Sequence, residues 1–304
     1  MKMMTGKILC PAAALLLALP AAGWARQMGQ QMGQQQQTPP QQQQGMGQQN
    51  QTGQTGQGQT GQGQTPPGQA APAQPTTPPV DPAEQKDYDA FNGLKGDDPT
   101  VVVKQGEAFL TKYPTSRFTG TVYARLTVAY MNTGDENKMN AAGEKALEIT
   151  PNNVDVLPVM AMATSRRLNP QDIDYQQKLR KTQTYANTGI QSLNALQKPT
   201  AMTDEDFAHA RDEKLAMCYS ALGLAELDQN KPVDATQHFT EALKLEAQPD
   251  PVDQYLLGLS FMGQNQFAQA ATAFDACAKP GTSMSDRCKQ ERDDAKKKAS
   301  TPHP

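Results

Sequence analysis

The chain has 304 residues, with 28 Lys and Arg against 31 Asp and Glu and a formal net charge of −3 at pH 7. This slightly acidic balance argues against a nucleic-acid surface, which needs a basic patch. The length allows one or two domains, but the composition is uneven. Residues 27–80 carry no charge, and 21 of these 54 positions are Gln.

The first 25 residues have the features of a secretory signal peptide. Lys2 and Lys7 precede a twelve-residue apolar run over 8–19, and the Ala-Gly-Trp-Ala segment at 22–25 offers small residues for cleavage. Such a run is too short to span a bilayer core, which needs roughly 20 residues. We therefore expect export to the periplasm or outside a bacterial cell, removal of residues 1–25, and no stable membrane insertion afterwards.

Residues 26–82 form a leader dominated by Gln, Gly, Pro and Thr. Short phrases recur in it, such as Met-Gly-Gln-Gln at 28–31 and 32–35 and Thr-Gly-Gln-Gly-Gln at 55–59 and 60–64. This composition buries too little apolar surface to offset an ordering cost of about 1–2 kcal/mol per residue. We expect a disordered linker, either a plain spacer or a tether that fixes the protein in the envelope.

From 83 to 300 the chain is rich in Ala, Leu, Lys and Glu at helical spacing, which predicts an all-α domain. Three of its segments share one pattern of aromatic, Leu-small, small and aromatic positions. Two copies lie 35 residues apart: Tyr219, Leu222, Gly223, Ala235, Phe239 and Ala242 correspond to Gln254, Leu257, Gly258, Ala270, Phe274 and Cys277. A looser copy upstream has Tyr123, Leu126, Tyr130, Ala146 and Pro151.

This pattern resembles the tetratricopeptide repeat, a helix–turn–helix unit of about 34 residues. The resemblance implies a helical-hairpin solenoid in which small residues lie where two helices cross closely. Gly134, Asn230 and Asn265 fall at the turns, where left-handed backbone is tolerated. The upstream copy departs from the pattern, because Thr127 and Met139 replace its two small residues.

Weaker helical patterns fill the rest of the solenoid. Asp98-Pro99 and Thr203 are suitable helix starts, because each supplies an N-cap side chain. We expect further helices at 84–96, 99–112, from after 151–153 to about 167, 172–196, 204–228 and 283–298. The last is interpreted as a polar terminal cap, which solenoids require.

The sequence offers no pattern typical of an enzyme. His209 and His238 fall on different expected helices, and His303 lies in the tail. No zinc-protease motif, nucleophile elbow or phosphate-binding loop is present. We therefore expect no catalytic residues, no cofactor and no metal site.

Three cysteines remain after removal of the signal peptide. Cys277 and Cys288 lie 11 residues apart, at the end of the last repeat and in the expected cap. In an oxidising compartment we expect them to form a disulfide that holds the cap, the alternative being two free thiols. Cys218 is then unpaired and expected to be buried.

The resemblance also implies where a partner would bind, since the first helix of each repeat lines the concave face. Most side chains in that register are apolar and four are Met, which suits an adaptable surface for an apolar helix or extended segment. The alternative is that they form internal core. The expected groove residues are Val128, Met131, Asn132, Met162, Arg166, Met217, Leu224, Leu227, Asp228, Tyr255, Leu259 and Met262.

Together these features predict a non-catalytic protein–protein interaction scaffold in the cell envelope or outside the cell, whose partner is a protein or peptide. The first alternative is a structural tether or spacer that acts through the Gln-rich leader. A carrier of small ligands in the solenoid cavity is a third possibility.

Overall fold

The computed structural model describes residues 81–94, 98–282 and 284–301, and within these ranges it consists of eleven α-helices and no strand. The expected signal peptide and all but the last two residues of the expected linker lie outside the described residues. The helices are α2 (Pro82–Asn92), α3 (Pro99–Lys112), α4 (Thr119–Thr133), α5 (Glu136–Ile149), α6 (Leu157–Ser165), α7 (Tyr175–Asn194), α8 (Asp204–Asp228), α9 (Pro232–Leu245), α10 (Pro251–Gly263), α11 (Phe267–Cys277) and α12 (Ser285–Ser300).

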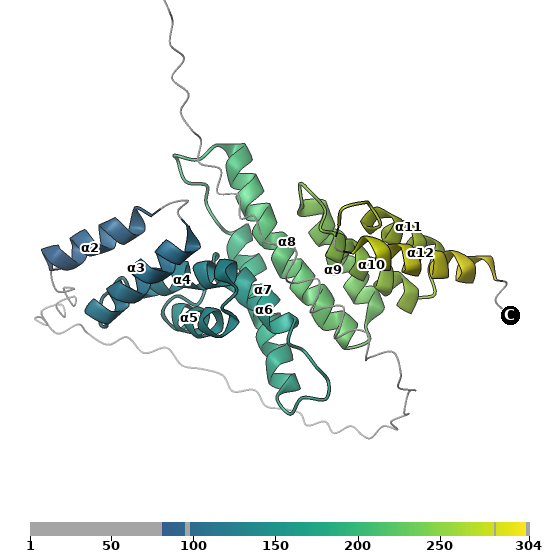
Figure 1. Ribbon diagram of the computed structural model, residues 1–304, viewed down its shortest axis with the longest axis horizontal. Coiled ribbons are helices and arrows are strands. Elements are labelled where there is room, and N and C mark those ends of the chain that lie inside the picture. Colours follow the sequence, from purple (N-terminus) through teal and green to yellow (C-terminus); the bar gives the residue numbers. More distant parts are fainter. Residues whose placement is uncertain (1–80, 95–97, 283, 302–304) are drawn as a thin grey trace, which may run out of the picture.

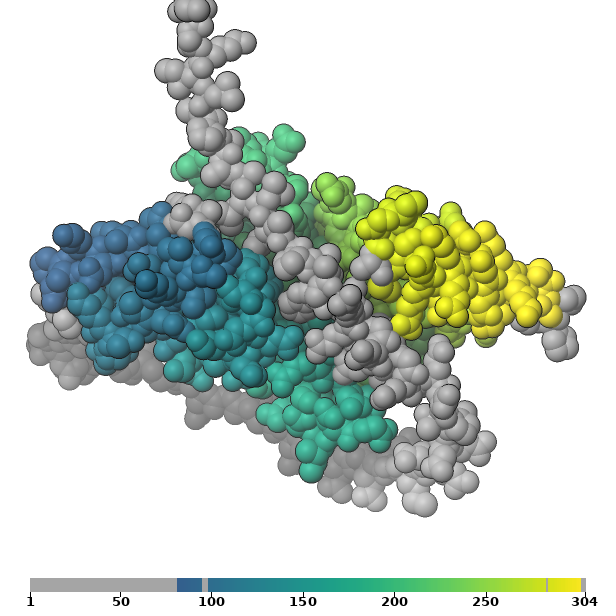
Figure 2. Space-filling model, in the orientation of Figure 1, coloured from purple at the N-terminus to yellow at the C-terminus, as the bar shows by residue number. Residues whose placement is uncertain are grey.

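The helices stack in chain order into an elongated solenoid (Figure 1). Most of them pack against the preceding and the following helix, and α8 also contacts α6. The long helix α8 crosses the middle of the molecule, with α2–α7 on one side and α9–α12 on the other (Figure 1). In the space-filling view the first helices and the last helices accordingly lie at opposite ends (Figure 2). The expected all-α hairpin solenoid is confirmed.

Side-chain caps set the start of several helices. Asp81, Asp98 and Asp250 each accept a hydrogen bond of 2.8 Å from the backbone N–H two residues on, and each is followed by Pro at the first helical position. Because Asp81 caps it, α2 begins at Pro82, the last residue that the sequence assigned to the linker. Thr203 caps α8, which has the bounds expected from the sequence.

The helix after the 151–153 turn is shorter than expected. The Asn153 side chain accepts hydrogen bonds from the backbone N–H of Asp155 and Val156, at 3.0 and 3.1 Å. These bonds stabilise a turn in place of the first helical residues. Helix α6 therefore begins only at Leu157 and ends at Ser165.

A glycine facing a phenylalanine closes each of the two regular hairpins. A Cβ added to Gly223 on α8 would lie 2.8 Å from the ring of Phe239 on α9, and one added to Gly258 on α10 would lie closer still to Phe274 on α11. Both rings are fully buried. Asn230 and Asn265 have φ values of 56° and 57° at the turns, as expected, and Gly134 plays the same part after α4.

The hairpin α4–α5 inverts these sizes. Thr127, which corresponds to Gly223, is fully buried, and Gly143 on α5 stands where Phe239 stands on α9. The space beside Gly143 is filled by Met160 of α6, whose side chain an added Cβ would overlap. In the upstream copy the larger residue is therefore on the first helix and the glycine on the second, and Met160 of the next helix fills the remaining space.

The last helix is fastened to the solenoid by a covalent bond and polar contacts. Cys277 and Cys288 form a disulfide with a Cα–Cα distance of 5.9 Å. Arg287 Nε donates to the hydroxyl of Tyr255 at 2.7 Å, and Arg292 pairs with Asp275 at 3.1 Å. Helix α12 thus covers the apolar end of α10–α11, and its buried residues are Ser285, Cys288 and Ala295.

Candidate functional site

The expected groove residues lie on four helices that alternate along the chain. Val128, Met131 and Asn132 are on α4, and Met162 is on α6 with Arg166 at its C-cap; Met217, Leu224, Leu227 and Asp228 are on α8, and Tyr255, Leu259 and Met262 are on α10. We call the surface formed by these side chains the inner face. Ten of the twelve are half-buried, and seven of those ten are apolar.

The apolar residues of the inner face fall into two groups that meet on α8. Val128, Met131 and Met217 pack against the core formed by the N-terminal helices. The second group, Leu224, Leu227, Leu259 and Met262, packs against the core of the C-terminal helices. Because α8 contributes residues to both groups, it connects the two halves of the inner face.

Two of the expected residues are internal. Met131 is buried in the N-terminal core. Tyr255 is only 1% exposed, and its ring packs against Phe274 while its hydroxyl contacts Arg287 of α12. Tyr255 therefore holds the cap helix in place and does not line an open surface.

A polar centre interrupts the apolar stripe. Asp253 in the first turn of α10 is buried, and the hydroxyl of Ser220 on α8 donates to its carboxylate. The Arg166 guanidinium interacts electrostatically with the carboxylates of Asp250, Asp253 and Glu136. The polar centre therefore links the end of α6 electrostatically to the start of α10.

Burial controls the ionisation of this centre. It raises the pKa of Asp253 well above its usual range, and the nearby carboxylates Glu246 and Asp250 add to the shift. Burial also raises the pKa of Glu246 to about 7. The hydrogen bond that its carboxylate accepts from the Asp250 N–H acts in the opposite direction and lowers this pKa. Burial lowers the pKa of Arg166, and the negative charges of the surrounding acids partly offset this shift.

The sequence did not single out Ser220, Asp253 or Glu246. Ser on a helix and acids at helix ends are usually exposed, and periodicity did not mark these three as facing inward. At the other end of α8, the hydroxyl of Tyr175 donates a hydrogen bond to Asp228. Asp228 of the inner face is thus hydrogen-bonded to the first residue of α7.

The described residues contain no group of three or more His, Cys, Asp or Glu side chains that could hold a metal ion. His209 lies on α8, and His238 on α9 pairs with Glu226, while His303 is outside the described residues. Within the part of the chain that the structure describes, no helix combines the length and the apolar character needed to cross a membrane.

No family model matches the chain, and no curated protein matches its sequence. Two solved structures match the chain, and each match covers 70% of this chain and 98% of the other one. One is TTC0263, a thermophilic tetratricopeptide-repeat protein of Thermus thermophilus, with 13% identity and a TM-score of 0.43. The other is MamA RS-1, as an ArsTM double mutant, with 15% identity and a TM-score of 0.38.

Proposed function

We propose that this chain is a non-catalytic scaffold that binds a segment of a partner protein along its inner face. One observation carries the proposal: seven apolar side chains of the inner face, along α4, α6, α8 and α10, are half-buried and so remain partly exposed. An apolar surface that stays partly exposed is typical of an interaction site.

The chemistry of the inner face defines the partner. Leu and Met side chains dominate, so the partner segment carries apolar anchors, as an amphipathic helix or an extended strand does. Met suits such a surface because its flexible side chain adapts to different anchors. A polyanion does not fit, since the charged groups around Arg166 are the acids Asp250, Asp253 and Glu136.

A double variant tests this proposal. Leu224→Glu with Leu259→Glu places two charges in the inner face, and both side chains are half-buried rather than fully buried. The matched control is Val233→Glu on α9, which is 55% exposed and outside the inner face. In pull-downs from envelope extracts, we expect the wild type and the control to retain the same partners and the double variant to lose them.

Circular dichroism and thermal unfolding must first show that the double variant is folded. A folded double variant that retains every partner would contradict the proposal. If it is unfolded, the milder change Leu259→Gln with Leu224→Gln repeats the test with less disruption of the C-terminal core.

We further propose that the protein is exported after cleavage behind Ala25, on the strength of the basic start and short apolar run over 8–19. The intact mass of protein recovered from the producing cells tests this directly. A mature chain should begin at Arg26, and recovery of only the uncleaved chain in the cytosol would contradict export.

The role of the leader is tested separately by deleting residues 27–80. If the solenoid is the working part, the deletion variant retains its partners. If the protein is instead a tether, the variant keeps its fold and loses its place in the envelope.

A further inference from the structure

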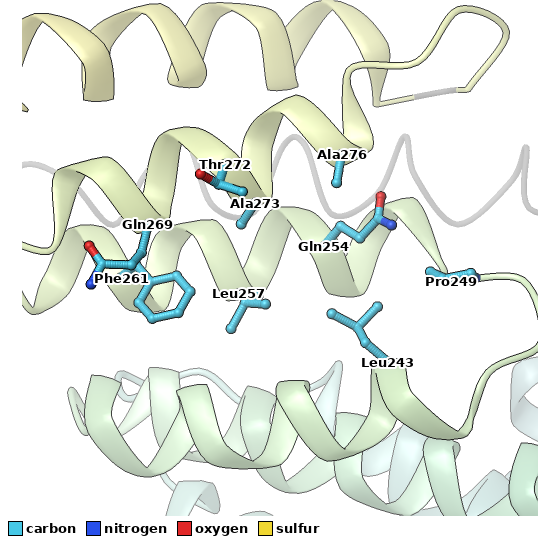
Figure 3. A pocket seen from close by; sticks show the side chains of 9 residues that line it. All are labelled: Leu243, Pro249, Gln254, Leu257, Phe261, Gln269, Thr272, Ala273 and Ala276. Carbon is cyan, nitrogen blue, oxygen red and sulfur yellow. The ribbon is translucent and has the colours of Figure 1, made fainter.

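An apolar pocket of about 430 Å³ opens on the hairpin α10–α11, away from the inner-face residues. Leu257 and Phe261 of α10 border it together with Leu243 of α9 (Figure 3). Ala273 and Ala276 of α11 leave the space between these larger side chains. None of the residues that line the pocket is charged.

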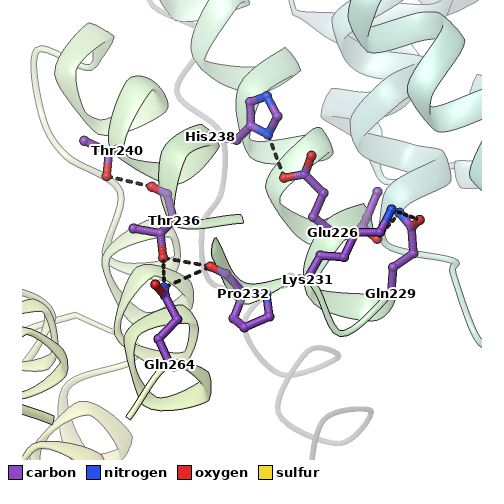
Figure 4. A network of polar contacts seen from close by, with 9 residues as sticks. Glu226, Gln229, Lys231, Pro232, Thr236, His238, Thr240 and Gln264 are labelled. Carbon is purple, nitrogen blue, oxygen red and sulfur yellow. Dashed lines mark hydrogen bonds and ion pairs between the residues drawn. The ribbon is translucent and has the colours of Figure 1, made fainter. Parts of the chain in front are cut away.

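The preceding hairpin carries polar side chains at the corresponding positions. At the positions 35 residues earlier, α8–α9 carries Tyr219, Glu226 and His238 in place of Gln254, Phe261 and Ala273. His238 Nδ1 lies 2.6 Å from Glu226 Oε2 (Figure 4). The Tyr219 ring stacks on the imidazole with a centroid distance of 5.9 Å. The open pocket on α10–α11 therefore results from particular substitutions within a shared register.

The size and chemistry of the pocket limit its ligand. A cavity of this volume is at the small end of ligand sites, far short of a stable protein–protein interface, which buries about 1,200 Å² or more. An uncharged lining favours an uncharged ligand, because burying an unpaired charge is costly. Gln254, Gln269 and Thr272 add amide and hydroxyl groups for hydrogen bonds. The best ligand is one apolar side chain flanked by neutral polar groups.

The leader contains such a segment in three copies. Met-Gly-Gln-Gln occurs at 28–31, 32–35 and again at 46–49. The three Met side chains are the only large apolar ones in residues 27–79, where Leu, Ile, Phe, Tyr and Trp are absent. Each copy thus offers one flexible apolar anchor, a glycine that permits close approach of the backbone, and two neutral amides.

We propose that the Met-Gly-Gln-Gln segments of the leader are an intramolecular ligand of the α10–α11 pocket. The Met side chain enters between Leu257, Phe261 and Leu243, and the Gln amides bond to Gln254, Gln269 or Thr272. The leader thereby folds back on the C-terminal half of the solenoid and covers its apolar pocket.

Because the leader is covalently joined to the solenoid, even a weak contact is enough to occupy the pocket. From Met46 to Pro82 the chain advances 36 residues, which extend to about 120 Å and exceed the dimensions of a domain of this size. Tethering gives an effective concentration in the millimolar range. A contact with a Kd of about 1 mM is then occupied in about half of the molecules, and three copies of the segment raise that fraction.

Methionine methyl NMR on the full chain tests the proposal. Replacing Met28, Met32 and Met46 by Ser identifies the three leader signals among the 14 Met of the chain. Relative to a synthetic peptide of residues 26–50, we expect at least one leader signal to be shifted by the Phe261 ring and broadened. Filling the pocket with Ala276→Leu should return it to the peptide position, whereas Ala268→Leu, at an exposed site on the same helix, should not.

Leader signals that coincide with those of the free peptide in the wild type would overturn the proposal, as would shifts that persist in folded Ala276→Leu. Shifts that grow with protein concentration would assign the contact to a second copy and overturn the intramolecular form. If Ala276→Leu does not fold, the synthetic peptide is added to the triple Met→Ser variant. Perturbed amide signals of α10 and α11 support the pocket, and unperturbed ones contradict it.

Discussion

The hairpins α8–α9 and α10–α11 have the same internal crossing and differ on their outer side. Inside, Gly223 lies against Phe239 and Gly258 lies against Phe274. Outside, the first hairpin is closed by the Glu226–His238 contact, whereas the second keeps an open apolar pocket. The repeat pattern thus fixes how two helices cross, and the positions outside it are free to acquire different chemistry.

The two hairpins also differ in how they are joined to the next helix along the chain. Helix α11 is cross-linked to α12 by the Cys277–Cys288 disulfide, and within the described residues α8–α9 has no such bond. We expect the C-terminal hairpin to depend on this bond, because α12 is a highly charged helix with few buried side chains.

The largest expected effect therefore comes from Cys277→Ser with Cys288→Ser. Loss of an 11-residue cross-link should lower the free energy of unfolding by about 3 kcal/mol, as measured by urea denaturation. Reduced wild-type protein should behave like the double variant. Equal midpoints for oxidised and reduced protein would show that α12 is held by its polar contacts alone.

The next largest losses of stability are expected at the two helix crossings. Gly258→Ala and Gly223→Ala each force a methyl group against a buried ring, and we expect losses of about 1–3 kcal/mol, larger at Gly258 where the ring is closer. Thermal unfolding measures both. Phe274→Leu should restore part of the loss in Gly258→Ala, and no loss at either glycine would contradict the close crossing.

A smaller effect concerns pH. The folded-state pKa of Glu246, about 7, lies above its usual value near 4.5, so the folded state binds more protons between these values. Its contribution to stability is complete below pH 4.5 and is lost as pH rises through 7. We expect Glu246→Gln to remove this loss and to be more stable than wild type at pH 8 by about 1–2 kcal/mol, after allowance for solvent screening.

The same substitution at exposed Glu148 provides the control for this pH measurement, since it should leave the pH dependence of unfolding unchanged. A wild-type stability that rises between pH 5 and 7 relative to Glu246→Gln would contradict the assigned direction.

The smallest expected effect is at the contact that closes α8–α9. Glu226 and His238 are half-buried, and pairs of this kind contribute about 1 kcal/mol or less. His238→Ala should therefore lower stability only slightly, as measured by urea denaturation beside Glu226→Gln. A loss above about 2 kcal/mol would show that the outer contact supports the hairpin as much as the inner crossing does.

The sequence predicted the regular hairpins because their pattern repeats without a gap. The offset of 35 residues pairs Gly223 with Gly258 and Phe239 with Phe274, and these are the residues that meet at the two crossings. The pattern did not predict the inverted hairpin, since Met160, which fills the space beside Gly143, comes from the next helix and lies outside the repeat.

The candidate site was predicted less completely. Helical spacing placed Leu224 and Leu259 on the inner helices, but it did not mark Tyr255 as buried under α12, because that depends on a helix outside the repeat. The buried Ser220–Asp253 pair was missed because an acid in the first helical turn is usually exposed. The pocket was missed because a cavity depends on the space that three helices leave between them.

Hydrogen exchange of the chain, with and without a partner segment recovered by pull-down, shows whether the segment binds at the inner face. We expect added protection on the inner helices, in 217–228 of α8 and 255–262 of α10. Protection confined to the outer helices α5, α9 and α11 would contradict binding at the inner face.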